Sequence, residues 1–106
     1  MNYFEAVMSE TGYEPMTTFW DDFSIADRFG EKAIIDTYKR AFEEWKSDVK
    51  YLTELVMVLN IKIWYYYEQG NHDLGKVYNR LWKQADGWCS ENLEGEDARY
   101  YFRTTD

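Results

Sequence analysis

The sequence predicts an all-α protein, a single-domain bundle of about four helices with an aromatic-rich core. The 106-residue chain has one proline and six glycines, which leaves little room for the many turns of a β-sandwich. Five tryptophans, ten tyrosines and six phenylalanines supply enough ring area for one substantial core. Apolar residues also recur at three- and four-residue steps along much of the chain, as in amphipathic helices.

Four segments carry this helical pattern. We expect helices over residues 18–29, 31–48 and 49–69, and a fourth that starts at Asn71 or His72 and ends near Asn92. Gly30 separates the first two, and Gly70 closes the third in the left-handed conformation that glycine tolerates. The pattern leaves open whether the third helix continues directly from the second.

The two ends of the chain are expected to be accessory to this bundle within one helical domain, residues 1–106. Residues 1–17 are expected to form an N-terminal arm. Residues 94–106 are expected to form a tail that packs on the bundle through Tyr100, Tyr101 and Phe102. For this tail, one more helical turn and an extended segment both remain open.

The stretch "SIADRFGEKAIIDTYKR", residues 24–40, begins like a helix-turn-helix DNA reader. Such a motif needs an apolar residue directly after its glycine, but Glu31 follows Gly30 here. The basic residues of the second helix are also offset by acids, and the chain has a formal charge of −8. These observations favour a structural helix pair and no direct binding of nucleic acid.

The acidic residues are concentrated toward the two ends of the chain. Residues 1–27 contain six acids and no Lys or Arg, and residues 86–97 contain five acids and again no Lys or Arg. If the bundle brings the ends together, these residues form one negative face. The candidate binding residues on this face are Asp21, Asp22, Asp27, Asp86, Glu91, Glu94, Glu96 and Asp97.

Two interpretations of such a face remain open. A net charge well away from zero keeps small domains soluble, with no further role. Alternatively, the acids mimic a phosphate backbone and bind a protein partner that has a basic, nucleic-acid-binding surface.

A second candidate surface lies on the third predicted helix. A helical wheel places Met57, Ile61, Trp64 and Tyr65 on the same side as Lys50, Glu54 and Glu68, which are expected to face solvent. Either the N-terminal segment covers this aromatic patch, or the patch is the seam of a homodimer or a binding site for a partner.

No set of residues indicates catalysis, and the chain is predicted not to be an enzyme. His72 is expected at a helix start, and Cys89 is expected to be a small, half-buried residue beside Trp88. The single His and single Cys do not form a zinc ligand set, and the acids lack the spacing of a calcium loop. We therefore expect no metal and no cofactor.

The chain is expected to be cytoplasmic and not to enter a membrane. Its N-terminus lacks the basic and apolar regions of a signal peptide. The most apolar stretch, residues 51–67, is interrupted by polar residues and is shorter than the roughly 20 residues that span a bilayer.

Three stretches, "TTFWDDFSIADRFG", "TELVMVLNIKIW" and "YYFRTTD", together resemble a group of small acidic proteins encoded by phages and conjugative elements of gut bacteria. The resemblance extends over Thr17 to Asp106 and brings no established site residues with it. It implies a setting in which small acidic proteins resemble inhibitors of host defence, of the anti-CRISPR or antirestriction type.

Overall fold

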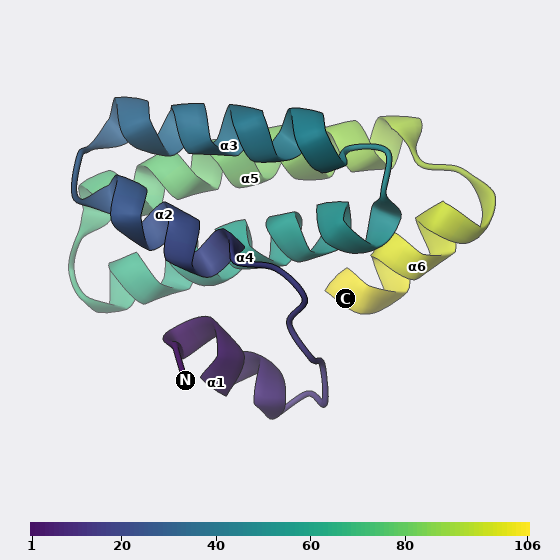
Figure 1. The fold of residues 1–106 in the computed structure, drawn as a ribbon, viewed down its shortest axis with the longest axis horizontal. Coiled ribbons are helices and arrows are strands. Elements are labelled where there is room, and N and C mark those ends of the chain that lie inside the picture. Colours follow the sequence, from purple (N-terminus) through teal and green to yellow (C-terminus); the bar gives the residue numbers. More distant parts are fainter.

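The computed structural model describes all residues from 1 to 106 and contains six α-helices and no β-strand (Figure 1). The helices are α1 (Tyr3–Ser9), α2 (Phe19–Asp27), α3 (Glu31–Trp45), α4 (Val49–Glu68), α5 (His72–Asn92) and α6 (Gly95–Thr105). The all-α prediction is confirmed, whereas the expected number of about four helices was too low.

The two additional helices lie at the chain ends. The N-terminal arm contains α1 because Asn2 and Glu5 form a capping box, in which each side chain accepts a hydrogen bond from the other residue's backbone N–H. The C-terminal tail is helix α6, with acidic residues in its first turn and Arg103 in its last, where they complement the helix dipole. Of the three side chains expected to pack the tail on the bundle, Tyr101 is fully buried and Tyr100 is half-buried. Phe102 was wrongly included, because the next residue of the helix points in another direction and is 43% exposed.

The breaks between the central helices follow from local capping. Helix α3 ends at Trp45 rather than at the expected Asp48, because Asp48 has an extended backbone and caps the start of α4. Its carboxylate accepts hydrogen bonds from the backbone N–H groups of Lys50 and Tyr51. Gly70, with a φ of 76°, closes α4, and Asn71 caps α5. Helices α3 and α4 are therefore separate, and α4 and α5 form an antiparallel pair.

Helix α4 is the centre of the molecule. Figure 1 shows α3 and α5 side by side above it, α2 crossing it, α1 below it and α6 at one end. Every residue from Leu52 to Leu59 is buried, and the buried apolar residues of all six helices form one continuous core. None of the helices combines the length and the apolar character that crossing a membrane requires.

Truncating this core should cost far more than truncating the surface. Leu59 is fully buried, so Leu59→Ala should lower the free energy of unfolding by about 2–5 kcal/mol through lost packing and the cavity left behind. Glu44 is exposed on α3, and Glu44→Ala should change it by less than about 0.5 kcal/mol. Urea unfolding of both variants measures the difference, and similar losses would contradict the central position of α4.

Candidate functional site

Six of the eight acids predicted for the binding face are exposed to solvent, namely Asp21, Asp22, Glu91, Glu94, Glu96 and Asp97. The other two, Asp27 and Asp86, are drawn into the structure by hydrogen bonds from tyrosine hydroxyls and do not belong to an exposed face. The prediction of the acidic face was therefore wrong at these two positions, because both carboxylates accept hydrogen bonds from tyrosine hydroxyls inside the protein.

These six acids, together with the exposed Glu5, form two patches, of which the first consists of Glu5, Asp21 and Asp22. In the first, Asn2 links the acids of α1 and α2: its backbone N–H donates to Glu5, and its side-chain amide donates to Asp21 at 3.3 Å. The second surrounds the turn between α5 and α6 and consists of Glu91, Glu94, Glu96 and Asp97. Helix α2 begins near the middle of the long axis, whereas α6 begins at one end of the molecule (Figure 1). We call these the N-terminal and C-terminal acidic patches.

Asp27 is the centre of a buried polar cluster. Its carboxylate accepts hydrogen bonds from the hydroxyls of Tyr66 and Tyr78 and forms an ion pair of 2.9 Å with Nζ of Lys62. The Lys62 ammonium also donates to Ser24 and lies 4.1 Å from the centroid of the Trp20 ring. Together these contacts join α2, α4 and α5.

Burial controls the titration of this cluster. It lowers the pKa of Lys62 against the opposing effect of Asp27, and it raises the pKa of Tyr78, with Asp27 adding to the rise. The side chain of Lys62 is 1% exposed and that of Asp27 is 7% exposed. The ion pair is therefore screened from solvent, and it holds α2 against α4.

Glu54 was expected to face solvent, but it is fully buried. Its carboxylate accepts hydrogen bonds at 2.8 Å from the Tyr13 hydroxyl and from the backbone N–H groups of Met16 and Thr17, and another from the Thr17 hydroxyl. The expectation from the helical wheel was wrong, because residues of the linker between α1 and α2 cover this side chain. Glu54 therefore fixes the linker to α4.

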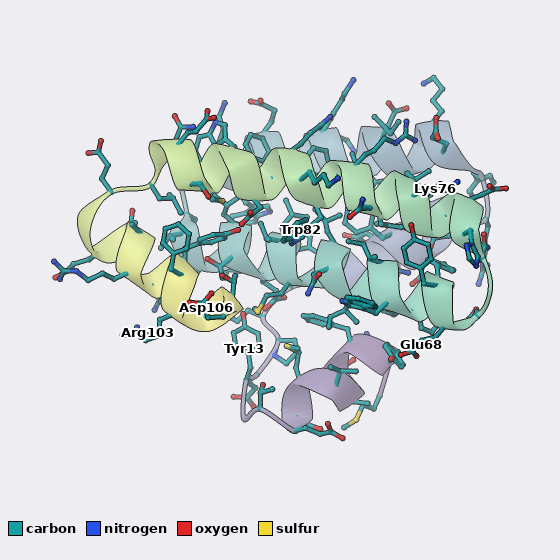
Figure 2. The ribbon with its side chains drawn as sticks, turned by 180° about the vertical axis from the view of Figure 1, so that it is seen from behind. Tyr13, Glu68, Lys76, Trp82, Arg103 and Asp106 are labelled. Carbon is teal, nitrogen blue, oxygen red and sulfur yellow. The ribbon has the colours of Figure 1, made fainter.

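Asp86 fixes the other end of the chain in a similar way. It accepts a hydrogen bond of 2.5 Å from the hydroxyl of Tyr101, which ties α6 to α5. Cys89 lies beside this pair and is fully buried rather than half-buried. Figure 2 shows Tyr13 of the linker near the end of α6 that carries Asp106, and the pKa of Tyr13 is raised in part by Tyr100 of α6.

The aromatic patch on α4 is largely covered. Met57 is buried, and Ile61 and Tyr65 pack against the core. The ring of Tyr65 lies 4.9 Å from that of Tyr3 and 5.5 Å from that of Trp20, centroid to centroid. The N-terminal segment therefore covers the patch at Tyr65, and Trp64, which is 59% exposed, is the one exposed residue of the four.

The structure also contains a groove that the sequence reasoning missed. It lies between α2 and α3, has a volume of about 780 Å³, and continues to Tyr51 at the start of α4. Helices α2 and α3 meet at the Gly30 turn and diverge from it (Figure 1). Ile25 and Phe29 are four residues apart, away from the buried residues of α2, and this spacing was a signal available in the sequence.

The remaining chemistry-bearing residues do not converge on a site. His72 is the first residue of α5, as expected, and its ring packs on that of Tyr67. No group of three or more His, Cys, Asp or Glu side chains is arranged to hold a metal ion. Comparison of the chain with protein-family models, curated proteins and solved structures found no match.

Replacing Glu54 should release the linker between α1 and α2. In Glu54→Gln, an amide NH₂ takes the place of one acceptor oxygen, and the donors that faced it lose their partner. We expect a loss of about 1–3 kcal/mol in the free energy of unfolding. Hydrogen exchange of the Met16 and Thr17 amides should also become faster.

Glu14→Gln, an exposed carboxylate in the same linker, is the matched control and should leave both measurements unchanged. Unchanged exchange at Met16 and Thr17 in the Glu54 variant would show that the linker is held by other contacts.

Alkaline pH should destabilise the fold. Burial raises the pKa of Cys89 from 9.0 to about 12 and that of Tyr38 from 10.0 to about 12. Between these values the folded chain keeps protons that the unfolded chain releases, so the free energy of unfolding should fall as pH rises from about 9 toward 12. The lowered pKa of Lys62 acts in the opposite direction, but the pKa values of six other buried or half-buried groups are raised. The six are Tyr13, Tyr38, Tyr66, Tyr78, Cys89 and Tyr101.

Urea midpoints measured from pH 7 to pH 11 test this expectation. Tyr38→Phe should make the decrease shallower because it removes one of the six groups. A midpoint that stays constant above pH 9 would contradict the expected protonation of the buried groups.

Proposed function

We propose that this protein is a non-enzymatic acidic binding protein that docks on a protein partner with a basic, nucleic-acid-binding surface. The proposal rests on the large number of exposed acids that form no ion pair within the chain. Fifteen of the twenty acids are exposed, and of these only Glu31 and Glu43 form an ion pair. Unpaired exposed carboxylates keep their field available to a partner.

The two acidic patches are the proposed contact regions. Asp21 and Asp22 lie in the first turn of α2, and Glu96 and Asp97 lie in the first turn of α6. Acids at these helix starts also stabilise the helix dipole, so a local structural role and a binding role coexist at these four positions. The resemblance to small acidic proteins of phages and conjugative elements suggests a setting for this activity, the inhibition of a host defence protein that handles nucleic acid. Cytoplasmic action is part of the same proposal.

A capture experiment tests this function. The immobilised protein is exposed to bacterial lysate, and bound proteins are eluted with duplex DNA at constant salt and identified by mass spectrometry. We expect nucleic-acid-binding proteins that DNA displaces, and capture that weakens as salt rises above about 0.1 M, where the Debye length is about 10 Å.

Two variants with the same change in net charge separate docking from simple ion exchange. Asp21→Asn, Glu94→Gln, Glu96→Gln and Asp97→Asn remove four charges from the patches, whereas Glu31→Gln, Glu43→Gln, Glu68→Gln and Asp73→Asn remove four exposed charges elsewhere. We expect capture to be lost only in the first set, with the helical circular dichroism spectrum of both unchanged. Equal losses would mean that the acids only provide net charge and solubility.

A further inference from the structure

We propose that the groove between α2 and α3 binds a basic amphipathic helix of a partner protein. This inference rests on the proposed function, because the acidic surface is what attracts a basic partner. It adds an apolar docking site that adjoins the N-terminal acidic patch at Asp22 and lies apart from the C-terminal patch.

Exposed apolar side chains line this groove. Met16, Ile25 and Phe29 are 44%, 57% and 77% exposed, and all three lie along it. They are three of the seven large apolar residues that the chain exposes, and the other four are Met1, Tyr3, Trp64 and Phe102. Large apolar side chains that collect at one concave site are typical of a binding surface.

The α3 side of the groove has the dimensions of a helix. Ala33, Thr37, Ala41 and Trp45 line it at four-residue steps, which corresponds to about 18 Å of helix axis, or just over three turns. The first three of these side chains are small. Small side chains allow another helix to approach to the usual axis separation of about 8–10 Å.

The groove is lined by more acids than bases, and this charge favours a basic helix as its partner. Asp22, Asp36 and Glu44 line it as acids, and Arg40 is the only base among the lining residues. Asp36 already pairs with Lys32, but neither Asp22 nor Glu44 forms an ion pair within the chain. Lysine or arginine beside an apolar stripe would match these two carboxylates. A second copy of this chain, with a net charge of −8, would meet repulsion.

The probe for this site is a fluorescein-labelled 14-residue synthetic peptide with Leu at positions i, i+4 and i+7 and Lys on both flanks. A scrambled peptide of the same composition, without a continuous apolar face, is its control. Fluorescence anisotropy measures Kd, and amide chemical shifts report whether Ala33, Thr37 and Ala41 respond. We expect the amphipathic peptide to bind at these residues and the scrambled peptide to bind at least about tenfold more weakly.

Two pairs of matched variants locate the binding. Ile25→Ser with Phe29→Ser should raise the peptide Kd at least about tenfold, whereas Trp64→Ser with Phe102→Ser, which removes exposed apolar groups elsewhere, should change it less than about twofold. Glu44→Lys should weaken binding more than Glu43→Lys, because only Glu44 lines the groove. All replaced side chains are exposed, and circular dichroism checks that each variant folds.

Several outcomes would overturn the groove assignment. Equal effects of the two serine pairs, or a complete lack of peptide binding, would reject it. So would a concentration-dependent dimer in light scattering that Ile25→Ser with Phe29→Ser dissociates, because a second copy would then occupy the groove. The acid set used for lysate capture leaves Asp22 and Glu44 intact, so rejection of the groove and rejection of the proposed function are distinguishable.

Discussion

Helix α4 runs through the middle of the molecule with protein on nearly every side, and its burial is the constraint on which the other elements depend. With residues 52–59 buried without a break, the helix has no solvent face there. Its two buried charges, Glu54 and Lys62, would each cost several kcal/mol without partners. Both partners come from the N-terminal part of the chain: the linker before α2 serves Glu54, and Asp27 of α2 serves Lys62.

Tyrosine is the residue that makes this arrangement possible. Asp27, Glu54 and Asp86 each accept a hydrogen bond from at least one tyrosine hydroxyl. A tyrosine ring fills space in the core while its hydroxyl satisfies a carboxylate that water does not reach. These bonds join α4 and α5 to the linker and to α6, and they therefore determine where both ends of the chain lie.

The same constraint shapes the surface. Thr17, just before α2, is held to α4 by its hydrogen bonds to Glu54, whereas the other end of α2 turns into α3 at Gly30. The two helices therefore diverge from this turn and leave the groove between them. Three carboxylates are used inside the fold, whereas most of the others remain unpaired outside it. The proposed binding function draws on the second group alone.

The sequence by itself determined the helical class and placed the start of α5 at Asn71 or His72, because these depend on local periodicity and capping. Whether the N-terminal segment or a partner covers the aromatic patch stayed open in the sequence, and the packing of Tyr3 on Tyr65 in the tertiary structure decided it. The sequence did not identify α1, although the capping pair Asn2 and Glu5 was visible. The burial of Glu54 and Asp27 was decided only by the tertiary structure. A charged side chain shows the same local pattern whether water or a distant hydroxyl satisfies it, and the partners here lie 35 to 51 residues away in the chain. The groove likewise depends on the angle between two helices, which long-range packing sets.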